Sequence, residues 1–600
     1  MQIQIKKNIR LIIALLFSGF VLSYLVCRAF YSEFISDETA SYWYFVYRGW
    51  FWGDQVVWDA ANHPLNSYIG YHLYNLFGDI PGILRSGSLI SYIFYAFATY
   101  KFTGLLNRKS LQILAFIALN SIPYMLEYFA YLRGYGLSMG FFMCGLWYLY
   151  KFANEQKIKY VIIIYFFSFI SFSANLTLLN SVILTIIAVV FVSFIHRKKF
   201  NWKQSAIIIL ASLLLIISCL PLIDFALKLK ASGALYYSSL DGIWDMTGKS
   251  LSRYIFFTDS DILMPIFLVV FILFLVILWR EFKKLGWDKL LLSSNTWIAY
   301  FFFGNLAAVI LMAFLLKIHY PEDRTGMYFI PLFFLLIFYL MQQVKYTEWL
   351  LLFFPITLFF HLSIHSSVFT PEERITEVFY QKVQNELKDD DVVSIYKTMY
   401  ANWQYRDSHQ NKMIHFPHTS MRKGNEADVF ITRSKVQAVD SFMNPYLATE
   451  YEIFAKDATN DHVAYRRKQT RKETLFYELD TTQLESSGEF LELFNRNSFF
   501  TNQQDVKLVF KFHLSIEDLR QSTDFVVTTS DEKGESVRYL AMALELNFQS
   551  KKLDNDLNFA VMLDNLQQNE KGIKVYLWNR KKNVMHKVSN LQIKMFDVKD

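Results

Sequence analysis

Long apolar runs alternate with short polar stretches over the first 370 residues, after which the chain becomes predominantly polar. A helix needs roughly 20 apolar residues to span a bilayer, and shorter buried helices are tolerated. The pattern therefore predicts a polytopic α-helical membrane region with about eleven transmembrane helices. The apolar runs fall near residues 11–30, 83–105, 111–126, 135–150, 158–173, 176–195, 204–222, 262–279, 294–316, 327–342 and 348–365.

Basic residues gather in alternate connections between these runs, as the positive-inside rule requires of cytoplasmic loops. With the N-terminus inside, the basic connections lie at 101–109, 151–159, 196–203, 280–289 and 345. The outer side then holds four stretches and, after an odd number of spans, the polar tail from Thr370. The outer stretches are 31–82, 127–133, 223–261 and 317–326.

The polar tail predicts two further domains after a membrane domain at 1–369. From 370 to 471, apolar strand-like runs alternate with polar helical patterns, which favours a small α/β domain. From 472 to 600, short alternating strands favour a β-sandwich of the jelly-roll kind. The predicted fold class is thus a helical membrane protein with a C-terminal extracytoplasmic α/β plus β-sandwich region.

Composition supports a membrane protein and argues against nucleic-acid binding. The chain is 53% hydrophobic and 18% aromatic, above ordinary globular usage. Residues 371–600 hold 32 basic and 35 acidic residues, a net charge of −3, so the remaining 28 basic and 18 acidic residues give the first 370 a net charge of +10. The basic excess lies in the apolar half, where it sets topology. All three cysteines also lie in apolar runs, which excludes a disulfide framework in the tail.

The first outer loop carries an acidic pair and a histidine. Ser36-Asp37-Glu38 directly follows the first apolar run, and His63-Pro64-Leu65 comes about 25 residues later. One interpretation is purely structural: Ser36 caps a helix, the acids favour the positive end of its dipole, and Pro64 begins another helix. The alternative is chemical, with a carboxylate as general base and an imidazole beside it.

Two later outer segments carry arginines. Glu127-Tyr128-Phe129-Ala130-Tyr131-Leu132-Arg133-Gly134-Tyr135 precedes one apolar run, and Asp323-Arg324-Thr325-Gly326-Met327-Tyr328 precedes another, with Pro331 following. A guanidinium binds phosphate oxygens through a planar fork and stays charged near lipid. The structural alternative for Arg133 is snorkelling at a helix end, and for Arg324 a salt bridge to Glu322 or Asp323.

Glu127 and Tyr135 belong to the same segment as Arg133. A carboxylate near a membrane is costly, so we expect Glu127 to be paired, with Arg133 as the candidate partner. Tyr135 is either a hydrogen-bonding group for a phosphate or sugar, or an interfacial tyrosine.

Together these segments resemble those of GT-C glycosyltransferases of the family 39 and aminoarabinose-transferase type. The acidic pair after the first helix is the most specific element, and the resemblance covers roughly the first 345 residues. The chain departs from the common pattern at Asn66, where many relatives have a second proline followed by an aromatic residue. The resemblance therefore implies the superfamily and leaves the sugar and the acceptor open.

The resemblance implies a membrane-embedded inverting transferase. Such enzymes move a sugar from a polyprenyl-phosphate carrier to an acceptor, which is a glycan, a lipid or a protein. Asp37 is implied as the base or a metal ligand, with Glu38 and His63 orienting it or helping it to hold a divalent metal. Arg133 and Arg324 are implied as phosphate clamps, with Tyr135 and Glu127 as further substrate-binding residues.

The resemblance also implies a multi-pass protein of the bacterial cytoplasmic membrane, with its soluble domains in the periplasm or cell envelope. Its partners would be the lipid-linked donor, an extracytoplasmic acceptor and membrane lipids, and no nucleic acid. Two other functions stay open: a transporter or flippase of lipid-linked sugars, which also needs many helices with few buried charges, and a non-catalytic scaffold.

Overall fold

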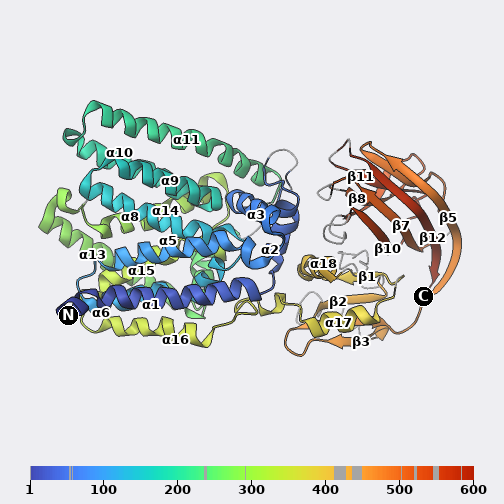
Figure 1. Cartoon of the computed structure of the whole chain (residues 1–600), viewed down its shortest axis with the longest axis horizontal. Helices are drawn as coiled ribbons and strands as arrows, with labels where there is room; N and C mark the ends of the chain where they lie inside the picture. The colour runs from blue at the N-terminus through green and yellow to red at the C-terminus, as the bar shows by residue number, and fades with distance from the viewer. Residues whose placement is uncertain are drawn as a thin grey trace. The chain divides into compact units, whose positions relative to one another are not determined.

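The computed structural model describes residues 2–52, 56, 58–234, 239–290, 292–388, 390–410, 427–434, 449–501, 503–518, 523–544, 553–580, 582 and 584–599. The chain divides into two compact units (Figure 1). The first comprises residues 1–33 and 44–369, and the second comprises residues 34–43 and 370–600. Residues 34–43, from the first outer loop, therefore belong to the same unit as the C-terminal region.

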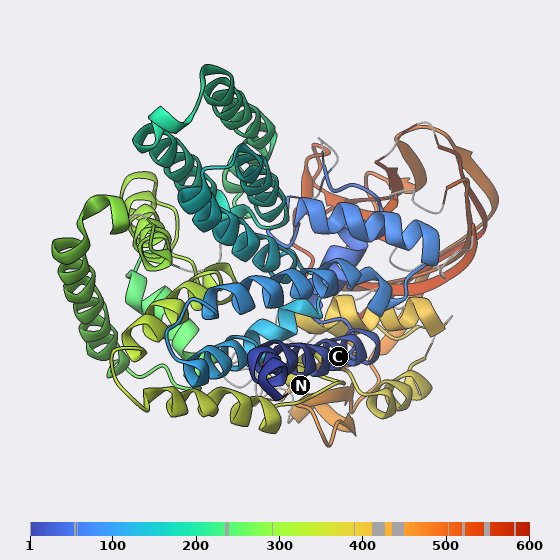
Figure 2. The same cartoon turned by 60° about the vertical axis from the view of Figure 1, so that its left-hand side comes forward.

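The regular secondary structure of the first unit is all helical among the described residues. Helix α8 is the central helix: it packs between α5 and α9 and is buried along most of its length (Figures 1 and 2). Its α-helices are α1 (Gln2–Tyr31), α3 (Pro64–Phe77), α4 (Pro81–Leu84), α5 (Ser86–Thr103), α6 (Lys109–Leu119), α7 (Pro123–Phe129), α8 (Gly134–Glu155), α9 (Ile158–Ala174), α10 (Leu179–Ile195), α11 (Trp202–Ala231), α12 (Lys249–Phe256), α13 (Leu263–Leu290), α14 (Ser294–Leu316), α15 (Phe329–Met341) and α16 (Phe353–Phe360). Short 3-10 or π-helical turns are η2 (Leu176–Leu178), η3 (Arg197–Lys199), η4 (Trp244–Gly248), η5 (Asp323–Gly326) and η6 (Thr347–Leu352), and η1 (Tyr42–Tyr47) continues from the second unit into this one.

Each of the eleven predicted runs lies largely in helix, although the run 111–126 is divided between α6 and α7 and helix α16 ends at Phe360, inside the run 348–365. Five described helices are long and apolar enough to cross a membrane, or six if the bent pair α6 and α7 is one span. The five are Ile9–Tyr31, Leu176–Ile195, Trp202–Ala231, Leu263–Lys284 and Ser294–Leu316. The chain is therefore a multi-pass membrane protein, and the number of eleven spans stays a prediction.

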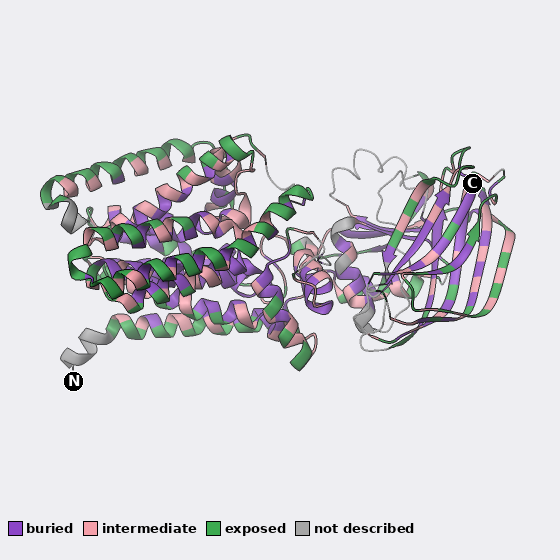
Figure 3. Ribbon diagram, turned by 90° about the horizontal axis from the view of Figure 1, so that it is seen from above, coloured by how far each residue is buried: buried purple, intermediate pink, exposed green. Residues whose placement is uncertain are grey.

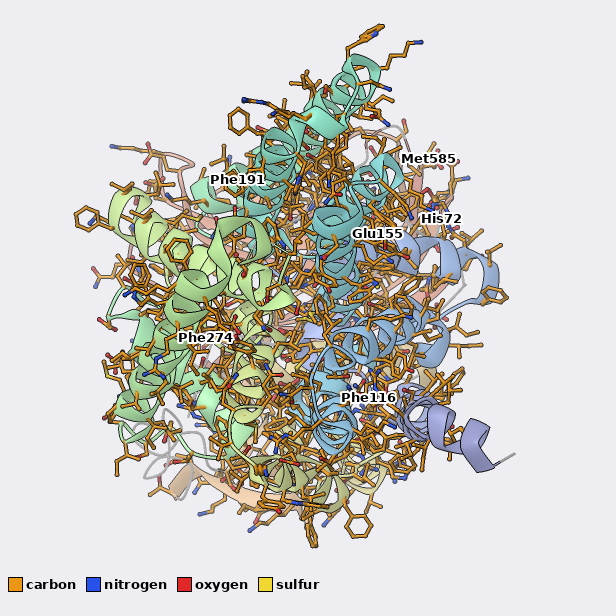
Figure 4. All side chains as sticks on the ribbon, turned by 90° about the vertical axis from the view of Figure 1, so that its left-hand side faces the viewer. His72, Phe116, Glu155, Phe191, Phe274 and Met585 are labelled. Carbon is orange, nitrogen blue, oxygen red and sulfur yellow. The ribbon has the colours of Figure 1, made fainter. Side chains whose placement is uncertain are left out.

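Burial in the first unit follows the requirements of a helix bundle in lipid. Large apolar side chains such as Leu214, Ile217 and Phe314 are 60% or more exposed on its outer helices (Figure 3). Phe116 and Phe274 are instead buried between helices (Figure 4). An apolar exterior over an equally apolar interior is the pattern expected where the surrounding solvent is hydrocarbon.

The second unit begins with helix α2 (Ser36–Ser41) and continues after residue 370 as a small α/β sheet. Strand β1 pairs with β2 in parallel and the other pairs are antiparallel, in the order β1-β2-β4-β3. Helices α17 and α18 contribute Phe379, Tyr380 and Trp403 to its core. The elements are η7 (Pro371–Glu373), α17 (Glu377–Glu386), β1 (Val393–Ile395), α18 (Lys397–Gln410), β2 (Val429–Arg433), β3 (Tyr451–Lys456) and β4 (His462–Arg467).

A β-sandwich completes the second unit. Its two antiparallel sheets have the orders β10-β7-β12-β5 and β6-β11-β8-β9, which is the strand order of a jelly roll. Alternate residues of both sheets face one core, as period-2 patterning requires. The predicted fold class, a helical membrane region followed by α/β and β-sandwich folds, is confirmed. The strands are β5 (Lys472–Ser486), β6 (Phe490–Arg496), β7 (Asp505–Ile516), β8 (Thr523–Ser530), β9 (Ser536–Ala543), β10 (Asp554–Leu563), β11 (Gly572–Asn579) and β12 (His586–Lys599).

Candidate active site

The acidic pair lies on α2, in the second unit. The helix begins at Ser36, with Ile35 as the N-cap residue. Glu38 is fully buried, and its carboxylate accepts a hydrogen bond from the Ile35 amide at 3.2 Å. This is one half of a capping box, so Glu38 stabilises the start of the helix. The capping interpretation therefore applies to Glu38. Asp37, the residue before it, is half-buried.

In the structural interpretation Ser36 caps this helix through its own side chain, and that part of the interpretation is wrong, because Ile35 is the N-cap residue. Both the amide and the hydroxyl of Ser36 donate to the carboxylate of Glu373, at 2.6 and 2.8 Å. One turn on, the Thr39 hydroxyl lies 2.5 Å from Oδ1 of Asn402 on α18. These bonds fix α2, and with it Asp37, to the α/β part of the second unit.

His63 occupies the N-cap position of α3, with Pro64 as the first helical residue. Its Nδ1 lies 3.0 Å from the carbonyl oxygen of Ala174, at the end of α9. A carbonyl only accepts, so Nδ1 carries the proton and the ring is held in one orientation. The edge of the ring contacts Tyr135 on α8, with 4.6 Å between ring centroids.

Gly134 makes this close arrangement of α3, α8 and α9 sterically feasible. A Cβ atom at this position would lie 1.8 Å from the Ala174 carbonyl oxygen and 2.7 Å from the His63 ring. The contact with Ala174 involves backbone, which cannot rotate away. Only a glycine fits between Arg133 and Tyr135.

Replacing Gly134 with alanine is therefore expected to displace His63 and to lower both thermal stability and activity. The strain of overpacking a tight site is about 1–3 kcal/mol. Gly145→Ala, in the same helix, is the matched control, because the nearest neighbouring atom to a Cβ at Gly145 would be 3.6 Å away. Thermal unfolding of the two variants in detergent checks this, and equal midpoints would contradict it.

Arg133 lies immediately before α8 and is only 2% exposed, so it does not snorkel towards solvent. Its Nη1 donates to the carbonyl oxygen of Ala61 at 3.3 Å, and its guanidinium carbon lies 5.6 Å from the centroid of the Tyr135 ring. The structure thus brings His63 together with Arg133 and Tyr135, which were predicted from a separate segment.

A row of tyrosines extends from this cluster. Tyr135 contacts Tyr128 at 5.6 Å between centroids, and Tyr128 contacts Tyr124 at 5.3 Å. Tyr124 is stacked on Tyr254, with centroids 4.1 Å apart and ring planes 4° apart. Sequence reasoning missed Tyr124, Tyr128 and Tyr254 as parts of one site. A signal was present, because Tyr124, Tyr128, Tyr131 and Tyr135 recur every three or four residues, as on one helix face.

The segment with Arg324 lies at the far end of this row. Asp323 has a φ of 50°, in the left-handed region, and its amide donates to the Ser250 hydroxyl at 3.0 Å. Burial raises the pKa of Asp323, against the opposing charges of Arg324 and Arg253 and a hydrogen bond from Tyr254. Burial also raises the pKa of Glu322, aided by the neighbouring Asp323. The charge of Arg324 acts against the burial effect on both carboxylates. The salt bridge and the phosphate clamp both stay predictions for Arg324.

An apolar cavity of about 240 Å³ opens beside this segment. The neighbouring helix α12 contributes Leu251 and Ile255 to its lining, and Leu251 also lies 3.6 Å from the Cβ position of Gly326 in η5. Phenylalanines from α13, α14 and α15 complete the wall: Phe267, Phe271, Phe302, Phe329 and Phe333.

No protein-family model and no curated protein matches the chain. Among solved structures, the chain is similar to ArnT from Cupriavidus metallidurans, solved in the apo state and bound to undecaprenyl phosphate. In each comparison the identity is 9% and the TM-score 0.41, and the alignment covers 75% of this chain and 97% of that one. It is also similar to the arabinosyltransferase EmbB from Mycobacterium smegmatis, at 10% identity and a TM-score of 0.30, over 96% of this chain and 64% of that one. At these identities and TM-scores the similarity assigns no activity to this chain.

Glu127 was expected to pair with Arg133, and that expectation is wrong. Its partner is Arg28 on α1, at 3.0 Å, and both side chains are buried. The carboxylate also accepts from the hydroxyls of Tyr131 and Ser367, each at 2.9 Å, and from the Val368 amide at 2.6 Å. With four donors already on its two oxygens, Glu127 holds α1, α7 and the segment after α16 together.

A divalent metal at Asp37, Glu38 and His63 stays a prediction. Across the described ranges, no group of three or more histidine, cysteine, aspartate or glutamate side chains is arranged to hold a metal ion. Two of the three predicted ligands also have structural bonds: Glu38 with the Ile35 amide and His63 with the Ala174 carbonyl.

Proposed function

We propose that this chain is a membrane-embedded inverting glycosyltransferase of the GT-C type, which moves a sugar from a polyprenyl-phosphate donor to an extracytoplasmic acceptor. The convergence of Arg133, Tyr135 and His63 at the start of α8 carries this proposal. A guanidinium and a phenol from one segment provide the charge and the hydrogen bonds that a phosphate requires, and the imidazole of His63, from a distant segment, lies against the phenol ring.

The donor would lie along the row of tyrosines. Arg133 would bind the phosphate oxygens and stabilise the charge that develops as the sugar departs. Arg324, at the other end of the row, is the alternative phosphate ligand. The isoprene chain would extend along the row towards the apolar cavity beside η5, since burying hydrocarbon there costs no polar contact.

Asp37 is our candidate base. In an inverting transfer the acceptor oxygen attacks the anomeric carbon, the bond from that carbon to the phosphate oxygen breaks, and a carboxylate takes the acceptor proton. Asp37 fits this role better than Glu38, because the carboxylate of Glu38 caps α2. If a divalent metal is bound, it would lie at Asp37 and offset negative charge on the departing phosphate.

Transfer from a defined donor tests this proposal. Purified protein in nanodiscs is supplied with polyprenyl-phosphate sugars and a set of acceptors, and Arg133→Lys is compared with wild type. We expect the variant to have a KM for the donor raised about tenfold or more, because an ammonium cannot make the bidentate contact. Arg197→Lys, at an exposed position in η3, is the control and should be unchanged.

Two outcomes would contradict the proposal. Movement of the lipid between leaflets with no transfer of sugar would make the protein a flippase. Transfer that is equal in wild type and Arg133→Lys would remove Arg133 from the donor site.

The location of the second unit is tested separately, by a reporter fused after residue 370, which we expect on the periplasmic side.

A further inference from the structure

The β-sandwich carries an aromatic outer face on the sheet β6-β11-β8-β9. On β11, Leu577 and Val575 point into the core, so Trp578 and Tyr576 point outwards. Pairing register places Phe490 of β6 opposite Trp578, and Tyr539 of β9 lies on the same face, opposite Thr528. We call Phe490, Tyr539, Tyr576 and Trp578 the aromatic face.

Three rings of the aromatic face contact one another, and two of its four residues are exposed. Phe490 is stacked on Trp578, with centroids 6.3 Å apart and ring planes 23° apart, and meets Tyr576 edge-on at 5.5 Å. Phe490 and Tyr539 are each 52% exposed. Val526, the aliphatic residue opposite Tyr576, is fully buried. The large apolar groups that this sheet exposes, among its described residues, are therefore aromatic.

Paired charges border the aromatic face. Arg580 lies over the Trp578 ring at 4.7 Å and forms an ion pair with Asp524, which is buried. Two further pairs are Lys582 with Glu489, at 3.0 Å, and Lys574 with Glu492, at 3.4 Å. Because each of these cations has a carboxylate beside it, the border is rich in hydrogen-bonding groups and close to neutral. Such a border does not suit a polyanion such as nucleic acid.

The opposite outer face of the sandwich has a different role. There Ala560, Met562 and Val598 pack on Val392 of the α/β part. Lys507 of the same sheet is buried and forms an ion pair with Glu473 at 2.8 Å. Packing within the second unit thus explains that face, and it does not explain the aromatic rings on the other sheet.

We propose that the aromatic face binds an uncharged oligosaccharide. A sugar ring has a flat C–H surface and a rim of hydroxyls, so it needs an aromatic plane with carboxylates and guanidinium groups around it. Trp578 and Tyr576 supply the plane, Glu489 accepts from the hydroxyls and Arg580, held in place by the buried Asp524, donates to them. The two rings are two positions apart on one strand, about 7 Å, so a ligand that contacts both has more than one sugar unit. The inference does not depend on the transfer reaction.

Binding of neutral oligosaccharides to the full-length protein tests this. Malto-, manno-, xylo- and arabino-oligosaccharides of four to six units are titrated into protein in nanodiscs and followed by calorimetry. We expect at least one of them to bind, and Trp578→Ala and Tyr539→Ala each to raise its Kd about tenfold or more. Trp578→Phe should retain most of the affinity, because it keeps a ring at that position. Leu475→Ala is the control, since this residue is 46% exposed on the other sheet.

Three results would overturn the proposal. One is that no oligosaccharide in the panel binds wild type at millimolar concentration. Another is that Trp578→Ala and Tyr539→Ala bind as tightly as Leu475→Ala. The third is that the face binds a second copy of the chain instead, seen as a wild-type dimer that Tyr539→Ala dissociates. None of the three depends on a lipid donor, so failure here is distinguishable from failure of the proposed transferase.

Discussion

Replacing Asp37 by asparagine is expected to lower the rate of sugar transfer by about 10²–10⁴-fold, the range that a positioned general base contributes. Asparagine has nearly the shape of aspartate and keeps the packing of α2, but it cannot take the acceptor proton. The lipid donor should bind with unchanged affinity, because an arginine and not Asp37 would bind its phosphate. Single-turnover transfer and equilibrium binding of polyprenyl phosphate measure the two quantities separately.

The neighbouring residue supplies the matched control. Glu38→Gln keeps an oxygen that accepts from the Ile35 amide, and glutamine is common at this position of a capping box. We expect its transfer rate to stay within a few fold of wild type. If Glu38→Gln lost as much activity as Asp37→Asn, the base would be misassigned. If Asp37→Asn transferred at the wild-type rate, neither acid would be the base.

The helices and strands could be predicted from local pattern. Apolar runs of membrane-spanning length identified the helical segments, since a chain in lipid must satisfy its backbone internally. The β-sandwich followed from period-2 patterning, as in Val506 to Phe512, where alternate residues enter the core. Each of these patterns is carried by residues that are only a few positions apart in the sequence. Each can therefore be recognised before the fold is known.

The candidate site could be predicted only in part. His63, Arg133 and Tyr135 were expected on one side of the membrane, and the structure brings them together through Gly134 and the Ala174 carbonyl. The attachment of Ser36 to Glu373 could not be predicted, because the partners are 337 positions apart and no local pattern encodes such a bond. The same is true of Arg28 and Glu127, for which the nearer Arg133 was the expected partner.

Replacing Glu127 by alanine should destabilise the helical unit by about 3–5 kcal/mol, the cost of breaking a buried ion pair from one side. Arg28 would keep its bonds to the carbonyl oxygens of Ser363 and Ser366, but its charge would be buried without Glu127. The amide of Val368 and the hydroxyls of Tyr131 and Ser367 would lose their acceptor as well. Thermal unfolding in detergent measures the loss. Glu155→Ala, which removes a partly exposed carboxylate at the end of α8, should change the midpoint little.

A double variant separates the ion pair from the packing around it. Arg28→Met with Glu127→Leu removes both charges together, and apolar replacements of buried pairs are often neutral or stabilising. We expect it to regain a substantial part of the stability that Glu127→Ala loses, and a double variant as unstable as the single one would contradict this. The backbone amide of Val368 would still lose its acceptor, so recovery should be incomplete. That remaining deficit measures how much Glu127 contributes by fixing residues 363–369, the last segment of the helical unit before the second unit begins.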